Sequence, residues 1–161
     1  MVVVSDTSPL TNLLKIGYPE LLKDVFGTVL IPEKVFEEIL AWKDPDINLS
    51  QITEANWLEV RTCSQKQQVE HLKNELDPGE AEAISLALEL SADYLLIDER
   101  RGYKIAKANG LNVLGLIGVL LKAKDMRITP NVLPLVEALR VKAGFWISEE
   151  LFQTIREISG E

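Results

Sequence analysis

Short apolar runs of strand length alternate along the whole chain with longer stretches of helical periodicity. The runs that predict strands are residues 2–4, 28–31, 57–60, 92–98, 112–114 and 145–147. Apolar positions at helical spacing predict helices over residues 7–16, 20–25, 32–40, 65–75, 77–90, 99–109, 117–123 and 131–141, and a last helix from residue 148. Strands that read as continuous apolar runs are typical of parallel sheets covered on both faces. The pattern therefore predicts an α/β fold with a central parallel sheet.

Composition narrows the chemistry that such a fold can carry. The chain has 161 residues, which suits one domain, and only one Cys and one His. These exclude an internal disulfide and a usual zinc site, so hydrolytic chemistry would rest on carboxylates, hydroxyls or lysines. No basic stretch precedes Asp6, and the longest apolar run, residues 113–121, is about half of what a membrane span needs. These features predict a cytoplasmic protein with no membrane partner.

Four carboxylates stand where an α/β fold places its sites. Ligands bind beyond the carboxyl ends of the strands, and Asp6 and Asp98 each end a predicted strand. Glu80 lies in the first turn of the helix before the second of these strands, and Glu38 lies inside the third helix. Converging carboxylates repel one another, and a hard divalent cation such as Mg²⁺ or Mn²⁺ removes that repulsion. The pattern favours a metal site that activates water toward a phosphodiester.

The same acids also have purely structural interpretations. Residues 77–80 fit a capping box, with Asp at the N-cap and Glu at the third helical position. Asp98 fits the N-cap of the next helix. Glu38 fits a solvated helix face, which is the interpretation we prefer for Glu37. Asp6 is harder to explain in this way, because it stands alone directly after a buried Val run.

Four segments resemble the motifs of PIN domains, the nuclease family named for the PilT N-terminus. They are residues 3–10 with Asp6-Thr7-Ser8, residues 32–39 with Val35 three residues before Glu38, residues 76–87 with Gly79-Glu80-Ala81, and residues 95–101 with Asp98-Glu99-Arg100. Their order, spacing and strand–helix context agree with the family along residues 2 to about 125. The pattern is most similar to a prokaryotic subgroup related to VapC-type toxins.

The resemblance implies a three-layer α/β/α sandwich and cleavage of RNA that depends on Mg²⁺ or Mn²⁺. It implies that Asp6, Glu38, Glu80 and Asp98 are the catalytic and metal-binding residues. The family often has Asp where this chain has Glu80. Glu82 is the second choice at that point, because it lies roughly 200° further around the helix.

Other residues near these acids are candidates for secondary roles. Thr7 and Ser8 would support the site by hydrogen bonding to Asp6 or to a metal-bound water, or would cap a helix. Glu99 fits either a peripheral ligand or the start of a surface helix. His71 lies in a polar helix and is interpreted as a surface residue.

The resemblance also implies partners and a division of the chain. Residues 1–125 would form the nuclease domain, and residues 126–161 a helical extension packed on the same domain. Proteins of this kind are usually toxins that are neutralised by a small antitoxin, and they usually dimerise. Four aromatic residues would then anchor an interface or lie in the core; they are Trp42, Trp57, Phe145 and Trp146.

Charge is distributed unevenly along the chain. The formal net charge is −8, but residues 1–99 carry −12, residues 100–142 carry +7 and residues 143–161 carry −3. The basic stretch begins directly after Asp98, and Arg100, Arg101 and Lys104 are candidates for binding an RNA backbone. A solvated basic helix is the alternative.

Two other functions are compatible with parts of this pattern. The first is a PIN-fold binding module of weak or no catalytic activity that acts through a protein partner. The second is a phosphotransfer domain of the haloacid dehalogenase or response-regulator type, since both place an Asp after the first strand. The former requires a second Asp where this chain has Ser8, and the paired acids and Lys of the latter have no clear match.

Overall fold

The computed structural model describes residues 1–161 and contains one five-stranded sheet in which all strands are parallel. The strands are β1 (Val3–Ser5), β2 (Val29–Pro32), β3 (Leu58–Arg61), β4 (Tyr94–Leu96) and β5 (Val113–Leu114). Their order across the sheet is β3-β2-β1-β4-β5. The chain therefore builds the sheet outward from the central β1, first to one side and then to the other. The predicted α/β fold with a central parallel sheet is confirmed.

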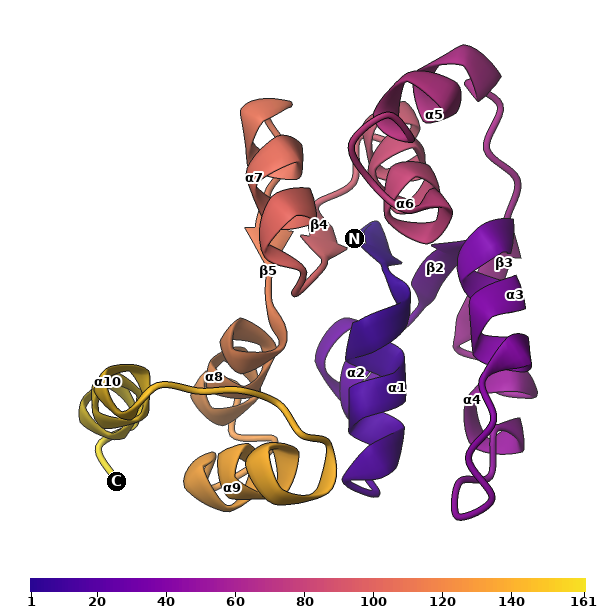
Figure 1. The fold of residues 1–161 in the computed structure, drawn as a ribbon. Helices are drawn as coiled ribbons and strands as arrows, with labels where there is room; N and C mark the ends of the chain where they lie inside the picture. Colours follow the sequence, from indigo (N-terminus) through magenta and orange to yellow (C-terminus); the bar gives the residue numbers. More distant parts are fainter.

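Ten helices surround the sheet (Figure 1). They are α1 (Thr7–Lys15), α2 (Leu21–Phe26), α3 (Glu33–Ala41), α4 (Ser50–Thr53), α5 (Lys66–Leu72), α6 (Pro78–Glu89), α7 (Arg100–Ala108), α8 (Leu116–Asp125), α9 (Leu133–Lys142) and α10 (Glu149–Ser159). The sequence predicted all of them except α4, which is only four residues long. None of these helices is long and apolar enough to span a membrane.

The strands divide the core into two layers because successive side chains point to opposite faces. Val3 of β1 packs into the cluster formed with α1–α4 and α8–α10, whereas Val4 packs into the cluster formed with α5, α6 and α7. In β4, Leu96 and Leu95 divide in the same way. Figure 1 shows α5, α6 and α7 together at the top of the view and α8–α10 at the lower left. Helices thus cover both faces, as a three-layer sandwich requires.

The C-terminal helices pack on the rest of the molecule. Val136 of α9 and Ile155 of α10 are buried in the same cluster as Leu13 of α1 and Leu120 of α8. The predicted division after residue 125 coincides with the end of α8, and as a domain boundary it stays a prediction.

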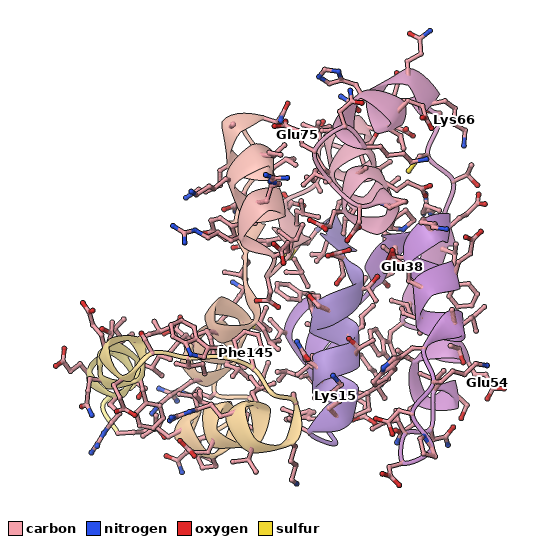
Figure 2. The ribbon with its side chains drawn as sticks, in the orientation of Figure 1. Lys15, Glu38, Glu54, Lys66, Glu75 and Phe145 are labelled. Carbon is pink, nitrogen blue, oxygen red and sulfur yellow. The ribbon has the colours of Figure 1, made fainter.

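The prediction of a strand at residues 145–147 is wrong. This segment has no strand partner and crosses from α9 to α10, where Figure 2 places Phe145. The Phe145 amide donates to the carbonyl of Leu139, 3.0 Å away, and so closes the end of α9. Ile147 is buried and Trp146 is exposed, an alternation that resembles a strand but here reflects a single extended crossing.

Most of the candidate interface aromatics lie in or against the core. Trp57 is buried, and Trp42 and Phe145 are partly buried against the main cluster. Trp146 is 83% exposed. Of the four, Trp146 alone therefore presents a free ring at the surface.

Candidate active site

The site lies where the strand order reverses, between β1 and β4. Ser5 pairs with Leu96 across these strands, and the Asp6 amide donates to the Leu96 carbonyl at 2.9 Å. Asp98 follows two residues after β4, so Asp6 and Asp98 emerge at the same edge of the sheet. A crevice at such a reversal is the usual ligand site of an open α/β sheet.

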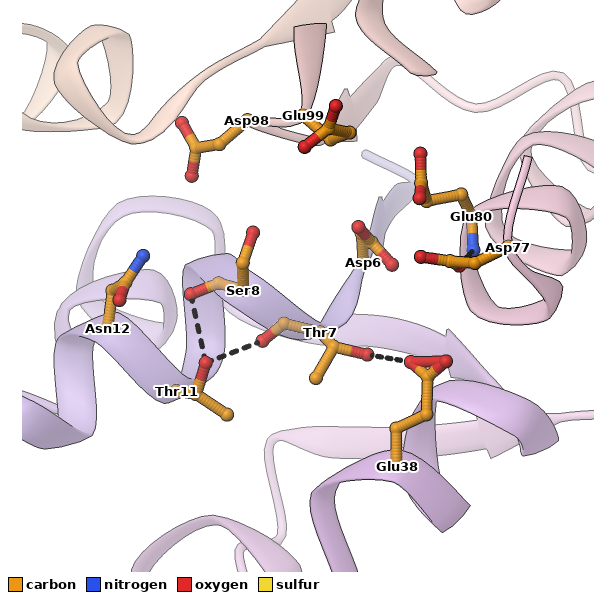
Figure 3. A pocket seen from close by; sticks show the side chains of 10 residues that line it. All are labelled: Asp6, Thr7, Ser8, Thr11, Asn12, Glu38, Asp77, Glu80, Asp98 and Glu99. Atoms are coloured by element: carbon orange, nitrogen blue, oxygen red, sulfur yellow. Dashed lines mark hydrogen bonds between the residues drawn. The ribbon is translucent and has the colours of Figure 1, made fainter. Parts of the chain in front are cut away.

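A hollow of about 350 Å³ occupies this position (Figure 3). It is lined by Asp6, Thr7, Ser8, Thr11, Asn12, Glu38, Asp77, Glu80, Asp98 and Glu99. Six of the ten lining residues are acids, and none is basic or hydrophobic. The four acids expected at the site come from four different parts of the chain and face the same space, as the sequence predicted. Their roles in metal binding and catalysis stay a prediction.

Asp6 lies in the middle of this hollow and is only 6% exposed. It occupies the N-cap position of α1, yet its side chain makes no capping hydrogen bond. Burial raises the pKa of Asp6 to about 7, and the charges of Asp77, Glu38 and Asp98 add to this, while the backbone of Thr7 opposes it. The carboxylate is therefore costly to hold in its charged form.

Asp98 is held by the beginning of a helix other than the one that follows it. Its Oδ1 accepts a hydrogen bond from the Leu116 amide of α8 at 2.8 Å, whereas the N-cap of α7 is Glu99. Asp98 Oδ2 is buried and has no partner. Burial raises the pKa of Asp98 to about 6, against the lowering effect of the Leu116 amide. One oxygen is thus fixed by an amide, and the other has no hydrogen-bond partner in the protein.

Glu80 is placed by the cap of α6. The Asp77 side chain accepts from the Glu80 amide at 2.8 Å, which fixes the first turn and confirms Asp77 as the N-cap. Glu80 Oε2 is buried without a hydrogen-bond partner. The pKa of Glu80 is raised to about 8, mainly by burial and further by the neighbouring acids Asp77, Asp6 and Glu99. Glu80 therefore faces the other acids and does not complete a capping box.

Glu38 reaches the hollow from α3 (Figure 2). Its Oε2 accepts a hydrogen bond from the Thr7 hydroxyl at 2.6 Å. Thr7 therefore supports the site through Glu38, whereas the sequence had suggested Asp6 or a metal-bound water. The adjacent Glu37 is exposed and pairs with Lys34 at 3.2 Å, which fits its interpretation as part of a solvated face.

Glu82 does not line the hollow. Its Oε1 accepts from the Lys34 amide at 3.2 Å, so it caps the beginning of α3. Glu99, by contrast, lines the hollow from the start of α7. The sequence interpretation missed Thr11 and Asn12. Helical spacing from Thr7 and Ser8 would have placed them on the same face of α1.

The donor set fits a hard divalent cation in kind, because every charged ligand is a carboxylate. The partnerless oxygens of Glu80 and Asp98 are suitable acceptors for such an ion. No three of the acidic, Cys or His side chains are gathered closely enough to hold an ion in their present arrangement. An ion would therefore have to draw these carboxylates together.

The candidate RNA-binding residues lie outside the acidic hollow. Arg100, Arg101 and Lys104 are all exposed on α7, directly after Asp98. His71 is exposed on α5, as expected.

Comparisons with known proteins agree with this geometry. A family model described as PIN domain matches residues 2–161. The chain is similar in structure to a PilT N-terminus domain protein from the hyperthermophilic archaeon Sulfolobus solfataricus. The TM-score is 0.58 at 22% identity, over 74% of this chain and 90% of that one, a likeness of fold. A comparison with curated proteins finds no match.

Proposed function

Because the chain belongs to the PIN-domain family, whose members are generally nucleases that use divalent metal ions, we propose that it is an Mg²⁺- or Mn²⁺-dependent endoribonuclease. The observation that carries the proposal is the convergence of Asp6, Glu38, Glu80 and Asp98 on one polar hollow at the reversal of the sheet. Two of these side chains keep a buried, partnerless oxygen.

The residues of the hollow have different roles in this proposal. Asp6, Glu38, Glu80 and Asp98 hold the ion, and Thr7 orients Glu38 through its hydroxyl. When bound, Mg²⁺ or Mn²⁺ supplies an activated water and neutralises charge on the phosphodiester. The hydrogen bond from Leu116 keeps Asp98 at the edge of the sheet, and Ser8 lines the hollow beside these acids.

Cleavage of single-stranded RNA by the purified protein with Mn²⁺ tests this proposal. We expect Asp6→Asn and Glu38→Gln each to lower the rate at least about 100-fold, because each removes a charged ligand. Glu37→Gln is the matched control, since Glu37 is exposed at the adjacent position of α3. This variant should cleave RNA at the normal rate. Equal activity in all variants, or no activity in the unaltered protein, would contradict the proposal.

A second candidate function is a non-catalytic PIN-fold module. The observation that favours it is the present spacing of the carboxylates, which gathers no three of them around one point. Thermal unfolding with millimolar Mg²⁺ or Mn²⁺ separates the two functions. A rise in the unfolding temperature that Asp6→Asn abolishes supports the metal site, and no rise supports the module.

We further propose that the protein is the toxin of a type II toxin–antitoxin pair. The resemblance of residues 76–87 and 95–101 to VapC-type toxins supports this role, as it supports a homodimer and a small antitoxin partner. Growth arrest on expression, relieved by a short neighbouring reading frame, is the expected result. Growth arrest that Asp6→Asn does not remove would contradict a catalytic toxin.

A further inference from the structure

We propose that the hollow beside α7 is a nucleotide-binding subsite, in which the ring of Tyr103 stacks on an RNA base while neighbouring cations hold the backbone. The site would then select single-stranded RNA. The inference rests on the proposed function for the identity of the polymer, and it adds a base-stacking residue that the acidic hollow does not contain.

The position of this hollow follows from the helical spacing of its residues. It measures about 520 Å³ and is lined by Asp98, Arg100, Tyr103, Lys104 and Lys107. The four residues of α7 stand at positions i, i+3, i+4 and i+7, which share one face of a helix. Asp98 lines both this hollow and the acidic one, so the two hollows share one lining residue. A strand cleaved at the acids would extend along α7.

The cations that line this hollow form no ion pair with the acids of the protein. Arg100, Lys104 and Lys107 are exposed and form no ion pair, although the chain carries 25 acidic residues. Arg100 stands in the first turn of α7, where the helix dipole disfavours a positive charge. The helix dipole accounts for Lys107 in the last turn but not for Arg100, whose charge a bound phosphate would stabilise.

Tyr103 gives the hollow an aromatic surface. Its ring is half-buried against the core cluster beneath α7, and Lys107 Nζ lies 5.5 Å from the ring centroid. The ring lines the hollow and the Lys107 ammonium lies over it, so a base that stacks there would take the place of this ammonium, which would turn to a phosphate. Only an unpaired strand can offer such a base, because the bases of a duplex are already stacked. The pairing of this ring with three cations therefore favours a single strand over a duplex.

Binding without cleavage tests the subsite directly. The probe is a fluorescein-labelled single-stranded RNA of about 10 nucleotides, followed by anisotropy in EDTA at low salt. Tyr103→Leu keeps apolar bulk against the core, and we expect it to weaken binding about 5- to 150-fold, the range for loss of one stacked base. Tyr103→Phe should bind as the unaltered protein does, because it keeps the ring.

A second Lys–aromatic pair provides a matched control. Lys122 Nζ lies 5.3 Å from the ring of Tyr94 and does not line the hollow. Lys107→Gln should lower the slope of log affinity against log salt by about 0.7, as expected for one lost phosphate contact to a single strand. Lys122→Gln should leave that slope unchanged. Equal effects of the two variants, or normal binding by Tyr103→Leu, would overturn the subsite.

The outcome for the subsite is separable from that for catalysis. Binding that depends on Tyr103, in a protein that does not cleave with Mn²⁺, would retain the subsite and remove the proposed function. Cleavage with Mn²⁺ together with affinity that is indifferent to Tyr103 would remove the subsite alone. Repeating the titration on Asp6→Asn with Mn²⁺ present keeps the substrate intact, and Tyr103→Leu in that background should again weaken binding. A duplex RNA that loses as much affinity as the single strand on Tyr103→Leu would also overturn the stacking role.

Discussion

Three of the four expected metal-binding carboxylates lie against a glycine. The pairs are Gly79 with Glu38, Gly102 with Glu80 and Gly115 with Asp98. A Cβ at Gly102 would lie 2.8 Å from Glu80 Oε2, and one at Gly115 would lie 3.1 Å from Asp98 Oδ1. These glycines therefore leave the space that the carboxylate groups occupy. Each glycine matters because it has no side chain where a carboxylate lies, and the positions of the acids in the sequence do not show this contact.

Gly79→Ala should reduce activity without a comparable loss of stability. The added methyl group meets the carboxylate of Glu38, the far end of a flexible side chain, which swings away at little cost. Ala is also the better helix former by about 1 kcal/mol. We expect a roughly 100-fold fall in RNA cleavage with Mn²⁺, the cost of a misplacement near 1 Å, and a change of less than about 1 kcal/mol in the free energy of unfolding in urea.

Gly118→Ala is the matched control for this prediction. A Cβ there also meets the end of a flexible side chain, Leu114 Cδ1, but neither Gly118 nor Leu114 lines the acidic hollow. The Gly118→Ala variant should cleave RNA at the normal rate. Full activity in Gly79→Ala, or an equal loss in Gly118→Ala, would show that the glycine does not place Glu38.

At the scale of elements, the beginning of α9 is capped by the side-chain carboxylate of Glu161. The Glu161 side chain accepts from the amides of Val132 and Leu133 at 2.9 and 3.2 Å, and from Lys124 Nζ at 2.7 Å. Burial raises the pKa of Glu161, but the three donors outweigh this effect and lower the pKa to about 2. Glu161 thus caps α9 from outside that helix, in place of the missing capping side chain at Val132.

Glu161→Ala should lower the free energy of unfolding by about 1–2 kcal/mol, the usual cost of losing an N-cap and its charged partner. Urea denaturation at neutral pH measures this, and hydrogen exchange should accelerate at the amides of Val132 and Leu133. Glu157→Ala in the preceding helix α10 is the control, because that side chain is exposed and forms no ion pair. Unchanged exchange at the two amides would show that water caps α9 equally well.

The elements also show how far the sequence determines the structure. The strands β1, β2 and β4 could be predicted because their side chains are buried on both faces, which yields unbroken apolar runs. Asp6 and Asp98 then followed from the rule that sites lie at strand ends. The partners of these acids could not be predicted, because Leu116 lies 18 residues from Asp98 and Glu38 lies 31 from Thr7. Such pairings depend on packing in three dimensions, as does the crossing at residues 145–147.

At the scale of the whole molecule, the acidic hollow is a source of instability. Burial raises the pKa of three carboxyl groups together, to about 7 for Asp6, about 8 for Glu80 and about 6 for Asp98. The folded protein therefore holds these protons more tightly than the unfolded chain does. Its free energy of unfolding is largest while they are protonated, and falls as the pH rises through their folded pKa values.

Asp6→Asn should consequently stabilise the metal-free protein above neutral pH while it abolishes cleavage. The pKa of Asp6 rises from 3.8 to about 7, so its ionisation costs roughly 2–4 kcal/mol that the amide avoids. In EDTA, urea denaturation should show the unaltered protein losing stability from pH 5 to pH 8 and Asp6→Asn losing less, whereas the exposed Glu37→Gln should follow the unaltered protein. Added Mg²⁺ should narrow the difference by neutralising the acids. If Asp6→Asn were instead less stable than the unaltered protein at pH 8, the hollow would be held together by its charged form, and the need for a cation there would disappear.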